Sequence, residues 1–188
     1  LARFALWRGD VARVTCWVGA LPDSVVTAEP ALSLHGSRAL YLAGQMERAE
    51  SLLRQAEQSL QDHDSDELKA LAEVYRAAMS AMRGENQAAA AATMRRLLDR
   101  RATMNIHTAA RAADTLGLAC ELVGDVVAAE QAYRQAADLA QAAGVTYLAI
   151  NARSECALTQ INRGRLAAAE EMCRLALDST SEETIPPT

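Results

Sequence analysis

Glycines recur at a constant step along this chain, and that spacing constrains the fold more than any other feature. Five glycines mark the pattern, and the last four are 40 residues apart: Gly9, Gly44, Gly84, Gly124 and Gly164. The position five residues after each of those four is an alanine: Ala49, Ala89, Ala129 and Ala169. A constant step of this length is typical of stacked supersecondary units. We therefore expect an all-α fold, a right-handed α-solenoid of about five antiparallel helix pairs with a 40-residue period.

Each glycine is expected to join the two helices of one pair. The expected spans are 1–8 with 10–20, 30–43 with 45–61, 66–83 with 85–100, 105–123 with 125–143, and 146–163 with 165–179. A sharp turn between antiparallel helices requires a residue with positive φ, which glycine adopts without a Cβ clash. Acidic residues follow three of the glycines and are expected in the first turn of the next helix, where the helix dipole favours them: Asp10, Glu85 and Asp125.

Three local features qualify this pattern. The stretch from Pro22 to Pro30 is expected to be the longest irregular connection. Asp64 and Glu67 have the spacing of a capping box for the helix that follows. In the third pair, Arg96 stands where pairs two, four and five have a small residue, so we expect looser packing there.

We expect residues 1–180 to form a single helical-repeat domain, and residues 181–188 to be a linker or frayed end. The chain opens on Leu1 within an expected helix, which indicates a segment of a longer protein.

Composition excludes several functions. The net charge is -5, whereas binding to phosphate backbones requires a basic stripe, so no direct nucleic-acid contact is expected. No apolar run approaches the length of a membrane span and no signal peptide is visible, so we expect a cytoplasmic protein without membrane contact. The four cysteines form no C-x-x-C pair, and three occupy positions where the repeat favours a small buried residue. We interpret them as reduced, packed thiols.

Two sets of residues carry a family resemblance. The fourth pair resembles the tetratricopeptide signature in the order of its packing residues: Leu116, Gly117, Gly124, Ala129, Tyr133 and Ala136. A longer set is similar to the helical-repeat region of large ATP-binding LuxR-type transcriptional regulators, the MalT-like group: W-V-G-A-L-P-D at 17–23, E-P at 29–30, Y-L-A-G-Q-M-E-R-A-E at 41–50, and the segments 123–143 and 163–177. In that family the region lies between a nucleotide-binding module and a helix-turn-helix. The resemblance implies that it receives an inducer or regulatory protein and relays this to oligomerisation and transcription.

Sequence motifs for catalysis are absent. There is no G-x-x-x-x-G-K-[ST], G-x-S-x-G or H-E-x-x-H motif, and the three histidines are far apart. His63 lies among acidic residues, but a solvated acidic loop is favoured over a metal site. We expect no enzyme activity, cofactor or metal. One basic cluster could dock an anion or partner, although we favour cations that complement a helix C-terminus: Arg95, Arg96, Arg100 and Arg101.

A ligand is expected on the concave surface, which the first helix of each pair lines in solenoids of this kind. By analogy with tetratricopeptides, seven polar or aromatic residues take the inward positions: Arg38, Tyr41, Arg111, Asp114, Glu121, Asn151 and Ser154. The third pair instead presents apolar residues there, either as an apolar floor or through a shifted register: Leu71, Val74, Ala78 and Ala81. We expect a protein or peptide partner or a small-molecule inducer, and self-association through an exposed end. The alternative is a generic tetratricopeptide-like scaffold that docks a protein or peptide.

Overall fold

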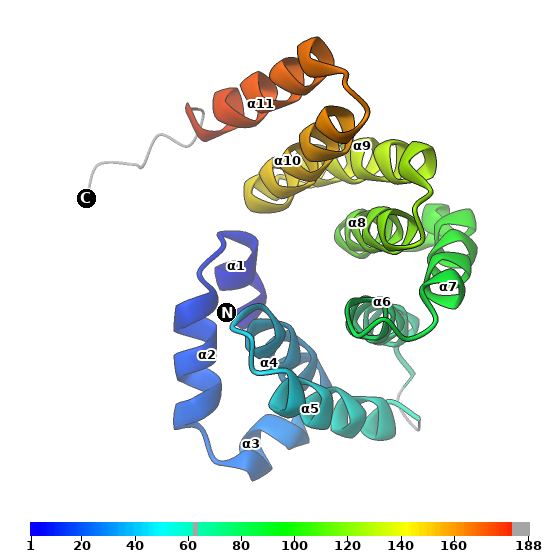
Figure 1. Ribbon diagram of the computed structural model, residues 1–188. Helices are drawn as coiled ribbons and strands as arrows, with labels where there is room; N and C mark the ends of the chain where they lie inside the picture. The colour runs from blue at the N-terminus through cyan, green and yellow to red at the C-terminus, as the bar shows by residue number, and fades with distance from the viewer. Residues whose placement is uncertain (62–63, 182–188) are drawn as a thin grey trace. The chain divides into compact units, whose positions relative to one another are not determined.

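The computed structural model describes residues 1–61 and 64–181, and this part of the chain is helical and contains no strand. The chain divides into two compact units, Leu1–Glu85 and a second unit that begins at Asn86. Each is described by itself. The all-α class predicted from the glycine spacing is confirmed (Figure 1). The predicted linker at 181–188 falls almost wholly outside the described residues, and Ser181 is the last residue of the final helix.

The first unit is built around one central helix. Its helices are α1 (Ala2–Trp7), α2 (Val11–Ala20), α3 (Asp23–Ala28), α4 (Pro30–Leu42), α5 (Met46–Ser59) and α6 (Asp66–Met82). Helix α4 contacts the other five, which surround it (Figure 1). Its buried face includes Leu34 and Leu40, which pack in a core with Val14 and Leu53 from the flanking helices. Pro30 begins α4 because proline at the first helical position loses no hydrogen bond.

The second unit is a succession of long helices with short turns. After α7 (Gln87–Asp99) and a 3₁₀ turn (Arg101–Thr103) come α8 (Ile106–Leu122), α9 (Val126–Ala142), α10 (Thr146–Asn162) and α11 (Leu166–Ser181). The last four helices begin 20 residues apart, and each contacts the helix before and after it (Figure 1). Their contacts are rich in fully buried alanine, such as Ala129 and Ala136, and this small side chain lets neighbouring helices approach closely.

The glycine turns have one geometry throughout. Every glycine predicted to join a pair has positive φ, between 71° and 81°, and Gly144 has the same conformation at 68°. At Gly124 the amide donates to the carbonyl of Glu121 and the amide of Asp125 donates to that of Cys120, both at 2.9 Å. This pair of bonds is the Schellman motif. The Asp125 carboxylate then accepts from the Ala128 amide at 3.1 Å, so one three-residue turn ends a helix and caps the next.

The predicted helix bounds mostly agree with the structure, with one clear omission. Nine of the ten expected spans match a helix to within two residues at each end, and the tenth, 85–100, begins at Gln87 and ends at Asp99. The stretch between Pro22 and Pro30, predicted to be irregular, instead contains α3. The two prolines bracket the segment, and both positions tolerate the missing amide proton because each lies at a helix start.

Two predicted helix starts are corrected by the cap geometry. The cap of α6 is Ser65, whose hydroxyl accepts from the Leu68 amide at 3.3 Å, so the capping role assigned to Asp64 was wrong. Helix α7 is capped by Asn86, which adopts a left-handed conformation at φ 51°. Glu85 therefore lies before the cap rather than in the first turn, whereas Asp10 and Asp125 are themselves caps.

The extra residue before α7 shifts its register. Helices α5, α9 and α11 begin two residues after their glycine, but α7 begins three residues after Gly84. Ala90 and Leu97 are consequently buried, while Ala89 and Arg96 are exposed. The looser packing predicted at Arg96 rested on the wrong register, because Leu97 fills that place.

The cysteine prediction is confirmed for two residues of the four. All four thiols are free, and Cys120 and Cys156 are buried, but Cys16 and Cys173 are exposed. In the part of the chain that the structure describes, no helix is both long and apolar enough to cross a membrane.

Candidate functional site

The seven residues predicted to line a binding surface fall into two groups, one in each unit. Arg38 and Tyr41 lie on α4 in the first unit. The other five lie on α8 and α10 in the second unit: Arg111, Asp114, Glu121, Asn151 and Ser154.

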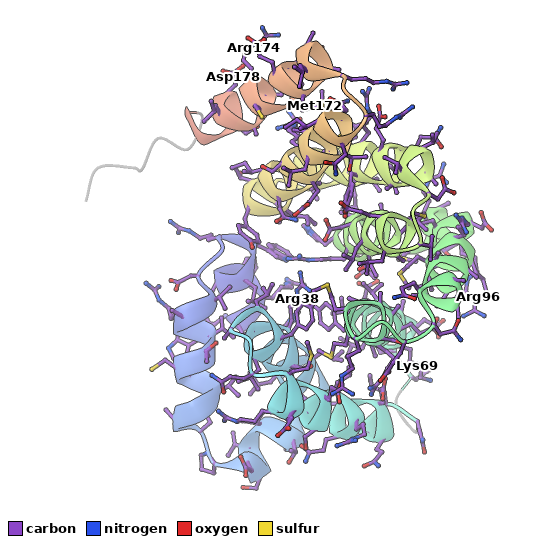
Figure 2. All side chains as sticks on the ribbon, viewed as in Figure 1. Arg38, Lys69, Arg96, Met172, Arg174 and Asp178 are labelled. Carbon is purple, nitrogen blue, oxygen red and sulfur yellow. The ribbon has the colours of Figure 1, made fainter. Side chains whose placement is uncertain are left out.

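Arg38 stacks on aromatic rings in the first unit. Its guanidinium carbon is 5.2 Å from the centre of the Tyr41 ring and 5.9 Å from that of Tyr75 on α6, toward which the side chain extends (Figure 2). Both distances permit a cation–π attraction. Tyr75 was not predicted, because it lies one position from the offset that the repeat alignment selected. The four apolar residues at those offsets are buried, so α6 presents packing residues there: Leu71, Val74, Ala78 and Ala81.

In the second unit, α8 and α10 both pack against α9 and also contact each other. Asn151 on α10 donates from Nδ2 to Oδ1 of Asp114 on α8, at 3.5 Å. These two predicted residues are 37 positions apart in sequence, and the structure brings them together. This contact marks one end of a polar surface shared by the two helices.

Tyr133 of α9 connects to the same surface from below. Its hydroxyl donates to Oε2 of Glu121 at 2.9 Å, and its ring is 2% exposed. Burial, then the charge of Glu121, raises the pKa of the Tyr133 phenol far above its usual range, so it stays protonated and acts as a donor. The ring lies against Gly117, where a Cβ would stand 2.5 Å from Cδ1 of Tyr133. The glycine and tyrosine of the tetratricopeptide-like signature are therefore a packing pair.

Glu155 completes this surface and was not predicted. Burial raises the pKa of its carboxyl, and the charges of Glu121 and Asp114 raise it further. Glu155 lies four residues after Asn151, so the same helical face contains both. That spacing is the sequence signal that could have identified it. We refer to Asp114, Glu121, Asn151 and Glu155 as the α8–α10 polar surface.

The two remaining predicted residues behave differently. Arg111 is only 8% exposed and has polar or electrostatic contacts of its own. Ser154 is exposed, and its hydroxyl donates to the carbonyl of Ile150 one turn earlier at 3.0 Å. Ser154 therefore satisfies its hydrogen bond within α10 and makes no recorded contact with the polar surface.

A second polar cluster in this unit is structural. The Glu130 carboxylate on α9 is 8% exposed and accepts from Gln160, Arg134 and Arg165 at 3.4, 3.1 and 3.4 Å, and also from Arg163. Burial alone would raise the pKa of Glu130, but the hydrogen bond from Gln160 and the three positive charges lower it overall. The cluster ties α9 to the end of α10 and to the turn before α11.

The basic cluster on α7 fits the helix-end interpretation. Arg101 donates from Nη1 to the carbonyl of Leu98 at 3.4 Å, and Arg95 donates weakly to Sγ of Cys120 at 3.5 Å. Arg96 projects outward from α7 (Figure 2). These side chains do not converge on one point. Among residues 1–61 and 64–181 no group of three or more histidine, cysteine or acidic residues could hold a metal ion, and the loop around His63 is partly outside that range.

In comparisons with known proteins, no family model matches this sequence, and no curated protein matches it either.

Proposed function

We propose that this chain is a non-catalytic binding segment that receives a positively charged group of a partner on the α8–α10 polar surface. One observation carries the proposal: burial and neighbouring carboxylates raise the pKa of Glu155, so its negative charge is destabilised in the free protein. A cation placed between Glu155 and Glu121 would remove that penalty. An arginine or lysine of a peptide, or an amine on a small inducer, has the chemistry required.

The wider architecture that we propose is a right-handed α-solenoid of about five pairs with a 40-residue period. The common geometry of the glycine turns supports it, as does the 20-residue spacing of the helix starts from α8 to α11. Small-angle scattering of the whole chain tests it. A radius of gyration clearly above about 16 Å, the value for a compact globule of this length, is expected of a solenoid. A value at or below that figure would contradict it.

We also propose that the segment belongs to a LuxR-type regulator of the MalT-like group, acting in the cytoplasm. The support is the resemblance of segments 17–23, 29–30 and 41–50 to that family. In this proposal, a ligand on the α8–α10 polar surface biases oligomerisation and transcription. The coding sequence around the segment tests it: a nucleotide-binding module upstream and a helix-turn-helix downstream are expected. If both are absent, the generic scaffold remains.

Peptide binding tests the polar surface directly. Fluorescence anisotropy with arginine-containing peptides should show saturable binding, and peptides with glutamate in place of arginine should not bind. Glu155→Gln and Glu121→Gln should each weaken binding about tenfold or more, since a charge-assisted contact is lost. Glu170→Gln is the matched control, because Glu170 is an exposed carboxylate on α11.

A stability measurement separates binding from a purely structural role. The raised pKa of Glu155 means that its ionised form destabilises the fold, so Glu155→Gln should increase the free energy of unfolding at neutral pH. This gain should vanish as the pH falls below the unfolded pKa of about 4.3, where wild-type Glu155 is protonated in both states. Weaker binding together with greater stability supports the proposal. Unchanged peptide binding in Glu155→Gln would overturn it.

A further inference from the structure

A small pocket lies within the first unit, where helix α3 faces helix α5. Its volume is about 170 Å³, and residues of α2, α3, α4 and α5 line it. Helix α3 is the element that the glycine repeat did not predict. Its side chains form one side of the pocket, so the insertion between α2 and α4 gives this unit a cavity that a plain helix pair would lack.

The inner part of the pocket is apolar. Four aliphatic side chains line it, one from each helix: Val18, Val26, Leu40 and Leu52. All four are buried. A floor of branched aliphatic groups favours a ligand with an aliphatic body.

The rim carries one charge of each sign. Asp23 of α3 supplies a carboxylate and Arg48 of α5 supplies a guanidinium. Within residues 1–61 and 64–181 neither side chain forms an ion pair, and Arg48 donates only to Oε1 of Gln45, at 2.6 Å. The guanidinium therefore retains donors for a bidentate contact with a carboxylate. Asp23 likewise retains acceptors for an ammonium group.

Uncharged polar groups complete the rim at helical spacing. On α5, Ser51 and Gln55 follow Arg48 at intervals of three and four residues, so they share its face. On α3, the Thr27 hydroxyl donates to the carbonyl of Asp23 at 2.9 Å and keeps its own lone pairs as acceptors. Two facing helices thus place hydrogen-bonding groups around an aliphatic floor.

From this arrangement we propose that the pocket binds a small zwitterion with a branched aliphatic body, of the class of free aliphatic α-amino acids. Arg48 binds the ligand carboxylate, Asp23 binds the ammonium group, and the aliphatic floor receives the side chain. The two rim charges sum to zero, as do those of the ligand. The volume suits this class, because a cavity of about 150 Å³ accepts benzene. The pocket belongs to the first unit alone, so this proposal stands or falls separately from the α8–α10 polar surface.

Isothermal titration calorimetry of the whole chain with L-leucine tests the proposal. A ligand of about nine non-hydrogen atoms is expected to bind in the micromolar to millimolar range. Two analogues report on the charges: isoamylamine lacks the carboxylate and isocaproate lacks the ammonium group. Each should bind about tenfold or more weakly than L-leucine, because one charge-assisted contact is lost.

Variants of the protein test the same contacts from the other side. Arg48→Gln and Asp23→Asn should each weaken L-leucine binding by about tenfold or more. Arg54→Gln is the control, because Arg54 is exposed on the same helix and does not line the pocket, so its affinity should match the wild type. The proposal is overturned if aliphatic amino acids show no saturable heat up to about 10 mM. Equal binding of isoamylamine, or wild-type affinity in Arg48→Gln, would overturn it as well.

Discussion

Replacement of Gly117 by alanine gives the most direct test of the packing in the second unit. A Cβ at this position would lie 2.5, 2.6 and 2.8 Å from Cδ1, Cε1 and Cγ of Tyr133. The ring cannot easily retreat, because it is 2% exposed and its hydroxyl is bonded to Glu121. Overpacking of this kind costs about 1–3 kcal/mol, and so close an approach belongs in the upper part of that range.

A second effect opposes the clash. Alanine is favoured over glycine in a helix interior by about 1 kcal/mol. Gly117→Ala should therefore lower the free energy of unfolding by about 1–2 kcal/mol in net terms. Urea unfolding of the whole chain, followed by far-UV circular dichroism, measures this value.

Two controls isolate the clash from the helix propensity. Gly19 lies in α2 with nothing within 4 Å of an added Cβ, so Gly19→Ala should be neutral or stabilising by up to about 1 kcal/mol. In a Tyr133→Leu background the ring is absent, and Gly117→Ala should become stabilising. If Gly117→Ala stabilises the wild type as Gly19→Ala does, or costs the same without the ring, the packing argument is refuted.

Three further predictions use the same unfolding assay. Ser65→Ala should cost about 1 kcal/mol because it removes the cap of α6, whereas Asp64→Ala should change stability little; equal effects would contradict the corrected cap. Ala129→Leu should cost about 1–3 kcal/mol, because Ala129 is fully buried where α9 meets α8, and an unchanged midpoint would show that the contact is loose. The lowered pKa of Glu130 means that its ionised form stabilises the fold above the unfolded pKa of about 4.3 and that this contribution is lost as pH falls through the folded pKa. Glu130→Gln should therefore be less stable than the wild type at neutral pH and approach it in acid; a constant difference across pH would contradict the assigned cause.

Much of the fold could be predicted from the sequence, because turn glycines and helical patterns are local signals. The bounds of α8, α9 and α10 differ from their expected spans by one residue at most. Helix α3 was missed because proline is a helix breaker in most positions, and here the two prolines mark helix starts instead. The register of α7 was missed because a single left-handed asparagine, Asn86, lengthens the turn.

The candidate sites were harder to predict, since they depend on contacts between helices. Repeat alignment selected Asp114 and Asn151, which do meet. It could not select Glu155, whose raised pKa arises from burial and from carboxylates on another helix. The pocket beside α5 was not predicted at all, because its acidic rim residue, Asp23, lies on the helix that the sequence pattern did not indicate.

The turns of the second unit also restrict how such a chain can lengthen. Gly124, Gly144 and Gly164 are 20 residues apart, and each reverses the direction of the backbone. Duplication of one helix with its turn would therefore invert every later helix, and the faces that now meet would separate. Duplication of two helices preserves direction. The parity of the helix number thus explains why an insertion of 40 residues can be accommodated where one of 20 cannot, although a turn recurs at each shorter interval.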